Sequence, residues 1–141
     1  MTTVFWDTNL FIYLFERNPQ FSPRVVEIRK NMLARGDRLL TSSLTVGEIL
    51  VKPAREGNRM LVNRYRSFFE HSALTVIPFD LKAACLYAEI RNDRGIARPD
   101  AIQLACAAAA EVDLFITNDE RLSAKRVPGV KFVTSLARAP L

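Results

Sequence analysis

The sequence has very little of the residue types that build several common catalytic and metal sites. It contains one histidine, His71, and two cysteines, Cys85 and Cys106. A single histidine excludes a zinc site built on several histidines and argues against a Ser-His-Asp triad. Both cysteines lie in alanine-rich helical patterns, so we expect buried thiols in a reducing compartment rather than a disulfide or a metal pair. His71 ends a helical pattern, and a capping or surface position is expected for it.

Long apolar runs and targeting signals are also missing. No run approaches the roughly 18–20 apolar residues that a membrane-spanning helix needs, and the start of the chain lacks the pattern of a signal peptide. The chain has 141 residues, of which 49% are hydrophobic, which suits one domain with a substantial core. These features predict a single domain over residues 1–141, a cytoplasmic location and no membrane partner.

The charge is biased toward basic residues, with 20 lysines and arginines against 15 acids. Basic residues gather at Lys52–Arg66 and at Arg121–Arg138, and the second segment contains no acid. Modest basicity suits an acidic partner such as nucleic acid. A solvated surface also accounts for such segments, so charge alone does not identify the function.

Short apolar runs alternate with helical patterns along the whole chain. Strands are predicted at Val4–Trp6, Leu39–Thr41, Leu74–Ile77, Leu114–Ile116 and Val130–Val133. The helices between them have recognisable limits: a start at Ser22-Pro23, an end at Gly36, a cap at Ser42 or Ser43, an end at Pro53, caps at Asn58 and Asp80, and a start at Pro99. This alternation predicts an α/β fold with a central parallel sheet of four to five strands, flanked by helices on both faces.

Four acids stand where predicted strands lead into helices or where helices begin. They are Asp7, Glu48, Asp100 and Asp119. Taken singly, each has a local explanation, since Asp is a good helix cap and the helix dipole favours an acid in the first turn. Taken together, they can converge on the edge where parallel strands end, which is where open α/β sheets bind ligands. Carboxylates gathered there would repel one another, and a hard divalent cation such as Mg²⁺ or Mn²⁺ would account for the cluster.

The stretches FWDTN, TSSLTVGEIL, RPDAIQLA and FITND carry these acids in the order found in PIN-domain ribonucleases. Over essentially its whole length the chain resembles the VapC-type toxins of toxin–antitoxin pairs. The resemblance implies a PIN-like fold in which the four acids are catalytic and hold one or two Mg²⁺ ions, with Mn²⁺ as a substitute. It also implies polar support from Asn9 and Thr117, and products with a 5′-phosphate and a 3′-hydroxyl. Expected partners are an RNA substrate, a cognate antitoxin protein and a second copy of the chain.

Several details stay open in this interpretation. Asn118 can cap the short helix after FIT, which would leave Asp119 in its first turn. Asp113 precedes a strand and is expected at the opposite end of the sheet, whereas Asp93 is expected on a surface loop. The candidate RNA-binding residues are Lys52, Arg55 and Arg59. Core packing is expected for five aromatic side chains, with a partner surface as the alternative: Phe11, Tyr13, Phe15, Phe68 and Phe69.

Two other functions compete with RNA cleavage. A PIN-fold module that binds RNA without cleaving it would have a similar composition. A phosphotransfer protein could use Asp7 as its nucleophile, but the phosphatase pattern needs an aspartate two residues later, where this sequence has Asn9. The receiver pattern needs a further acidic pair near the first strand, and that pair is absent from the sequence. A metal-dependent endoribonuclease is therefore the preferred interpretation.

Overall fold

A five-stranded parallel sheet forms the centre of the computed structural model, which describes residues 2–141. The strands are β1 (Thr3–Trp6), β2 (Arg38–Ser42), β3 (Leu74–Ile77), β4 (Leu114–Thr117) and β5 (Phe132–Ser135). They lie in the order β3-β2-β1-β4-β5, and every pairing is parallel. The predicted α/β fold is confirmed, with five strands in the sheet.

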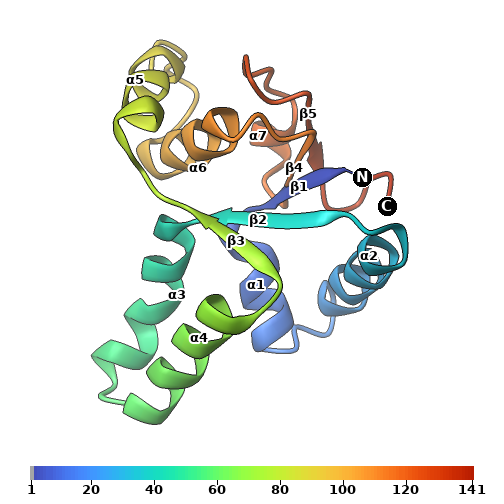
Figure 1. Ribbon diagram of the computed structural model, residues 1–141, viewed down its shortest axis with the longest axis vertical. Coiled ribbons are helices and arrows are strands. Elements are labelled where there is room, and N and C mark those ends of the chain that lie inside the picture. The colour runs from blue at the N-terminus through green and yellow to red at the C-terminus, as the bar shows by residue number, and fades with distance from the viewer. Residues whose placement is uncertain (1) are drawn as a thin grey trace.

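Helices cover both faces of this sheet (Figure 1). One face carries α1 (Thr8–Phe15), α2 (Ser22–Arg35), α3 (Ser43–Arg55) and α4 (Arg59–His71), and the other carries α5 (Leu81–Ile90), α6 (Arg98–Ala109) and α7 (Glu120–Ser123). The chain moves outward from β1 to β2 and β3, then crosses back through α5 and α6 to β4. The direction of winding thus reverses between β1 and β4. Such a reversal marks the crevice where doubly wound sheets bind ligands, beyond the carboxyl ends of the strands.

Alternate residues of each central strand pack into opposite layers, which explains why these strands are apolar throughout. Val4 and Trp6 join the cluster formed with α1 to α4, whereas Phe5 joins the cluster formed with α5 and α6. Phe5 also stacks on Phe115 of β4, with 5.0 Å between the ring centroids. The five aromatic side chains expected in the core all belong to the α1–α4 cluster. Both layers therefore anchor β1 and β4, the two strands at the reversal.

Capping residues set the helix limits largely as predicted. Ser42, not Ser43, caps α3 and accepts a hydrogen bond from Thr45 N at 3.3 Å. Asp80 caps α5 in the same way, accepting from Ala83 N at 3.0 Å. Gly36 ends α2 in the left-handed conformation, with a φ of 73° that glycine adopts without strain.

Two predicted limits are wrong. Helix α3 continues through Pro53 to Arg55, and the last helical carbonyls keep donors, since Lys52 O accepts from Glu56 N at 3.0 Å and Pro53 O accepts from Asn58 N at 2.9 Å. The last strand is Phe132–Ser135 rather than Val130–Val133. Its register is set by pairing with β4, and the predicted start at Val130 lies in the turn before it, buried in the core.

The cysteine prediction is half right. Both thiols are free, but only Cys106 is buried, and Cys85 is exposed on α5. The buried face of α5 contains Ala83 and Ile90, seven residues apart, and Cys85 lies off this face. His71 is the last residue of α4 and is exposed, as predicted. None of the helices in residues 2–141 is long and apolar enough to cross a lipid bilayer.

Candidate active site

Asp7 lies where β1 ends and α1 begins, beside β4. Its N–H donates to the carbonyl of Ile116 at 3.0 Å and so extends the pairing of β1 with β4. Its carboxylate accepts two hydrogen bonds of 2.8 Å, from Thr8 N to Oδ1 and from Thr117 Oγ1 to Oδ2. Only 7% of the residue is exposed. Asp7 is therefore the N-cap of α1 and, at the same time, a fixed carboxylate at the reversal point of the sheet.

Glu48 reaches the same edge from α3. The end of β2 and the cap at Ser42 place the start of α3 at the carboxyl edge, and Glu48 follows in the second turn. Its Oε1 accepts a hydrogen bond of 2.8 Å from Thr8 Oγ1. Since Thr8 also binds Asp7 through its backbone, this one residue links two of the predicted acids. The rest of Glu48 is exposed.

Asp100 and Asp119 approach from the other layer of helices. Asp100 lies in the first turn of α6 and is half-buried. Asp119 follows β4 and is exposed, and its Oδ1 accepts from two backbone N–H groups of α7, at 2.9 and 3.3 Å. Asp119 is therefore the cap of α7. Asn118 is not the cap, and its Nδ2 donates to Tyr13 Oη at 2.9 Å.

These carboxylates act on one another electrostatically. Burial is the main reason that the pKa of Asp7 rises from its ordinary value of 3.8 to about 6; the charges of Asp100 and Glu48 contribute, and the two hydrogen bonds oppose the rise. The pKa of Asp100 is also raised, by burial first and then by the charges of Asp119 and Glu48. The four acids therefore share one region of negative charge.

In the part of the chain that the structure describes, no basic side chain pairs with these acids. Over the same range, no three His, Cys, Asp or Glu side chains form a ready-made metal site. Hard oxygen donors without a counter-charge are nevertheless the ligands that Mg²⁺ and Mn²⁺ take, together with waters and substrate oxygens. The chemistry of the donor set fits such an ion.

The two residues expected to give polar support differ in their positions. Thr117 is fully buried, donates to Asp7 Oδ2, and accepts from Asp119 N at 3.1 Å. It therefore joins the strand-end acids of β1 and β4. Asn9 is exposed in the first turn of α1, and in the described part of the chain no hydrogen bond connects its side chain with the four acids. Its supporting role stays a prediction.

A buried polar cluster behind the acids was not predicted from the sequence. It consists of Thr8, Ser42, Thr45 and Gln103. All four residues are buried, and Gln103 is only 1% exposed. A signal was present, because Gln103 is a large polar residue in an otherwise apolar helix and lies one turn after Asp100. That spacing puts both residues on the same side of α6.

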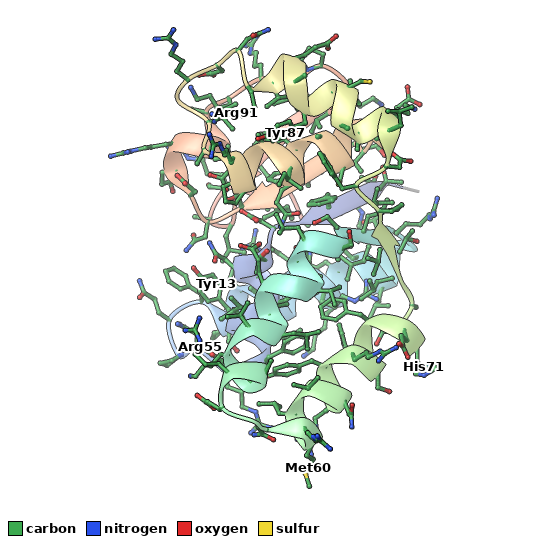
Figure 2. All side chains as sticks on the ribbon, turned by 90° about the vertical axis from the view of Figure 1, so that its left-hand side faces the viewer. Tyr13, Arg55, Met60, His71, Tyr87 and Arg91 are labelled. Atoms are coloured by element: carbon green, nitrogen blue, oxygen red, sulfur yellow. The ribbon has the colours of Figure 1, made fainter. Side chains whose placement is uncertain are left out.

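The candidate RNA-binding residues extend away from the acids along α3. Lys52 lies one turn after Glu48, and both line a groove of about 360 Å³ between α1, α3 and α4. Arg55 ends α3 and Arg59 begins α4. In Figure 2, Arg55 lies toward the lower end of α3, on the α1–α4 side, whereas Tyr87 and Arg91 belong to the α5–α6 side. Of the three candidates, Lys52 is the one that shares a surface with a predicted acid.

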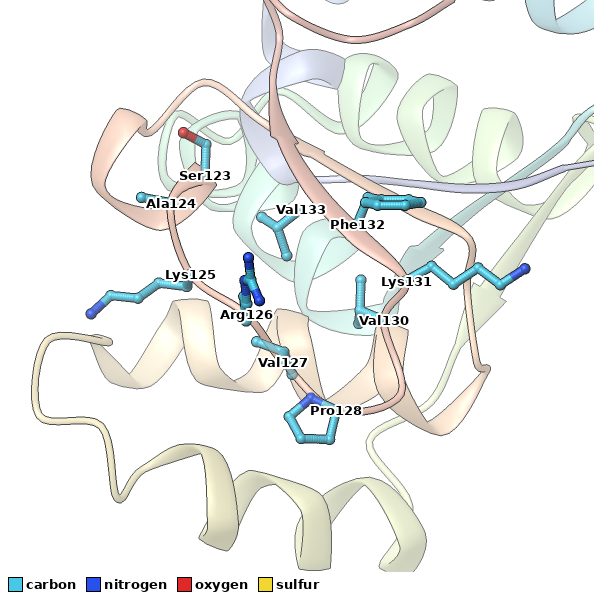
Figure 3. A pocket seen from close by; sticks show the side chains of 10 residues that line it. All are labelled: Ser123, Ala124, Lys125, Arg126, Val127, Pro128, Val130, Lys131, Phe132 and Val133. Carbon is cyan, nitrogen blue, oxygen red and sulfur yellow. The ribbon is translucent and has the colours of Figure 1, made fainter.

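A pocket larger than this groove lies elsewhere and contains none of the four acids. It has a volume of about 630 Å³ and is lined by residues 123–128 and 130–133, between α7 and β5 (Figure 3). Its two lysines, Lys125 and Lys131, point outward in opposite directions. Each is paired with an acid, Lys125 with Asp93 at 2.9 Å and Lys131 with Asp113 at 3.3 Å. The unpaired carboxylates therefore favour the carboxyl edge of the sheet over this pocket as the candidate site.

The acids predicted to lie outside the site do so. Asp113 precedes β4 at the amino edge, where Oδ2 accepts from Thr3 N at 2.8 Å and from Thr3 Oγ1 at 3.0 Å. Asp93 is exposed in the connection between α5 and α6 and bonds to Gly95 N at 2.9 Å.

Similar folds occur in solved structures of toxin–antitoxin complexes. A chain of VapBC2 from Rickettsia felis, bound to a DNA fragment from their promoter, matches with a TM-score of 0.70 and 21% identity, covering 94% of this chain and 98% of that one. A chain of FitAcB from Neisseria gonorrhoeae matches with a TM-score of 0.66 and 25% identity over 96% and 99% of the two chains. A toxin–antitoxin complex from Klebsiella pneumoniae matches with a TM-score of 0.64 and 24% identity over 90% and 94%. No curated protein matches the sequence.

The family model for the PIN domain matches residues 4–128. This range begins in β1, ends in the segment before β5, and includes all four acids at the carboxyl edge. The match extends over most of the chain, and it agrees with the resemblance inferred from the sequence motifs. The protein belongs to the PIN-domain family.

Proposed function

We propose that this protein is a metal-dependent endoribonuclease and the toxin of a VapBC-type toxin–antitoxin pair. PIN domains are generally nucleases that use divalent metal ions. The observation that carries the proposal is the group of carboxylates from four separate elements at the reversal of the sheet, with which no Lys, Arg or His of residues 2–141 forms an ion pair. Asp7, Glu48, Asp100 and Asp119 are the proposed ligands of one or two Mg²⁺ ions, and Mn²⁺ would substitute.

The residues of the site would bind the metal ion and the RNA. Bound Mg²⁺ would supply an acidified water and neutralise charge on phosphate oxygens. Asp7 is the fixed ligand, since burial and two hydrogen bonds restrict its carboxylate. Glu48 and Asp119 are exposed and can meet the substrate side of the site. Lys52, Arg55 and Arg59 are proposed to bind RNA phosphates, with Lys52 nearest to the acids.

An antitoxin partner fits the groove beside Glu48. The groove combines apolar and aromatic walls, including Ile12, Phe15 and Tyr65, with three carboxylates, Glu48 among them. A segment with apolar side chains and a basic residue would match this lining, and it would cover one of the proposed metal ligands. The solved structures of similar fold include toxin–antitoxin complexes. The homodimer that the family resemblance implies stays a prediction, which the mass of the protein in solution tests.

Substitution of single carboxylates tests the proposed reaction. Asp7→Asn and Asp100→Asn should each slow Mg²⁺-dependent cleavage of a structured RNA by at least about 100-fold, because a ligand is lost. Asp113→Asn is the matched control at the opposite edge and should cleave at the wild-type rate. Expression of the wild-type chain alone should arrest growth, and expression of the two inactive variants should not.

The alternative function predicts a different result. A PIN-fold module that only binds RNA would shift the RNA in a gel without cleaving it at any concentration of Mg²⁺ or Mn²⁺. If Asp7→Asn cleaved RNA as fast as the wild-type protein, the assignment of the metal site to these four acids would be wrong.

A further inference from the structure

Gln103 occupies an unusual position for an amide side chain. It lies in the alanine-rich helix α6, surrounded by buried residues, and is 1% exposed. A buried amide is costly unless its oxygen and both of its N–H groups have partners. Here the Oε1 atom accepts from Ser42 Oγ. The Nε2 atom donates to Thr8 Oγ1 at 2.9 Å and to Thr45 Oγ1 at 2.7 Å.

The hydrogen bonds of this cluster run in one direction, toward Glu48. Each threonine hydroxyl has one proton to donate. Thr8 donates its proton to Glu48 Oε1 at 2.8 Å. Thr45 Oγ1 lies 3.0 Å from Thr8 Oγ1, and because the Thr8 proton is already used, Thr45 is the donor. Every proton from Gln103 onward therefore points toward the carboxylate of Glu48.

The same cluster joins the elements that carry three of the proposed ligands. Gln103 is one turn after Asp100 on α6, and Thr8 directly follows Asp7 at the start of α1. Glu48 and Thr45 both belong to α3, whose cap is Ser42. A buried network with every group satisfied is rigid and fixes a single arrangement of its neighbours.

We propose that Gln103 is a positioning residue that holds the Glu48 carboxylate, through Thr8, in the place where it binds a divalent cation. This inference rests on the proposed function. Glu48 needs such help because it is exposed and its side chain has several rotatable bonds. Fixing the carboxylate before the ion arrives removes an entropy cost from binding. Groups that orient metal ligands in this way typically change metal affinity by about 10–100-fold when they are lost.

The test compares Mn²⁺ affinity, measured by electron paramagnetic resonance, with thermal stability and cleavage kinetics. Gln103→Met keeps the volume of the side chain and removes the amide. We expect the Kd for Mn²⁺ to rise about tenfold, with little change in the KM for RNA. Thr8→Val should reproduce this change, and Thr8→Ser, which keeps the hydroxyl, should bind Mn²⁺ as the wild-type protein does.

A second comparison separates positioning from a general effect on folding. In a Glu48→Gln background, Gln103→Met should cause no further loss of Mn²⁺ affinity, because the residue it positions no longer binds as a carboxylate. Two results would overturn the inference: a lower melting temperature with unchanged Mn²⁺ affinity, or an equal loss of affinity in both backgrounds. Failure of wild-type protein to bind Mn²⁺ would reject the proposed metal site as well, whereas wild-type binding and cleavage with an unaffected Gln103→Met variant would reject the positioning role alone.

Discussion

The carboxylates at the two edges of the sheet differ in whether a basic side chain pairs with them. At the amino edge, Asp113 accepts from Thr3 N and pairs with Lys131, and Asp37 accepts from Thr2 N and pairs with Arg35. At the carboxyl edge, among the described residues, no cation pairs with any of the four acids. The hydrogen bonds from Thr3 lower the pKa of Asp113, whereas burial raises the pKa of Asp7 and of Asp100.

This difference separates a structural use of acids from a functional one. A paired carboxylate at the amino edge ties the chain ends to the sheet and contributes to folding. At the carboxyl edge, Asp7 and Asp100 oppose folding, since burial removes their hydration and the neighbouring acids repel their charges. A fold retains such an arrangement most readily when a bound ligand offsets the lost hydration and the repulsion between the carboxylates. Changes at the two edges should therefore have opposite effects on stability.

The largest expected effect on stability comes from Asp7→Asn in metal-free protein. A carboxylate whose pKa rises from 3.8 to about 6 on folding costs roughly 3 kcal/mol when it is ionised in the native state. The folded protein binds more protons than the unfolded chain between these values, so this cost appears as the pH rises from about 4 to about 6. We expect Asp7→Asn to be more stable than the wild-type protein by up to about 3 kcal/mol at pH 8, in urea unfolding with a chelator present.

The pH dependence provides the control for this prediction. The stability advantage of Asp7→Asn should shrink below pH 6 and disappear below about pH 3, where wild-type Asp7 is protonated in both the folded and the unfolded state. Asp119→Asn changes an exposed carboxylate and keeps a good helix cap, so it should alter stability by less than about 0.5 kcal/mol. An Asp7→Asn protein that is less stable than wild type at pH 8 would mean that burial does not penalise this charge.

The next effect is stabilisation by the ion itself. A ligand that binds only the folded state adds about 2.7 kcal/mol at a free concentration near 100 times its Kd. Mn²⁺ should therefore raise the midpoint of urea unfolding of the wild-type protein, and removal of the ion with a chelator should reverse the gain. The gain should be largely lost in Asp7→Asn. An equal gain in both proteins would place the bound ion away from this edge.

The sequence predicted the acids of the carboxyl edge better than the buried polar side chains behind them. Each strand-end acid follows an apolar run, so a local pattern was enough to find Asp7 and Asp119. Gln103 gave a weaker signal, because one polar residue in a helix that is buried at nearly every position from Ala101 to Ala108 does not by itself reveal its partners. Its partners come from β2, α1 and α3, and only the folded chain brings them together.

Errors in the predicted elements have the same origin. The strand predicted at Val130–Val133 was based on apolar character, and Val130 is indeed buried. The true strand is selected by its hydrogen bonds to β4, which pair Phe132 with Leu114. The local pattern would place the buried Val130 in the strand and the exposed Phe132 outside the core. The strand nevertheless begins at Phe132, because pairing with a strand distant in sequence sets its register. Local pattern identifies which segments meet, and long-range contacts fix how they meet.

A smaller loss of stability is expected from a change at the amino edge. Asp113→Ala removes the acceptor of Thr3 N and Thr3 Oγ1 and the partner of Lys131, and should destabilise the protein by about 1 kcal/mol at pH 7. Because folding lowers the pKa of Asp113, its contribution is present above pH 4 and is lost as the pH falls further. The difference between Asp113→Ala and wild type should therefore shrink as the pH falls below about 4, while RNA cleavage at pH 7 stays unchanged. A gain in stability at pH 7 would remove the contrast between the edges, since the amino-edge acid would then oppose folding just as Asp7 does.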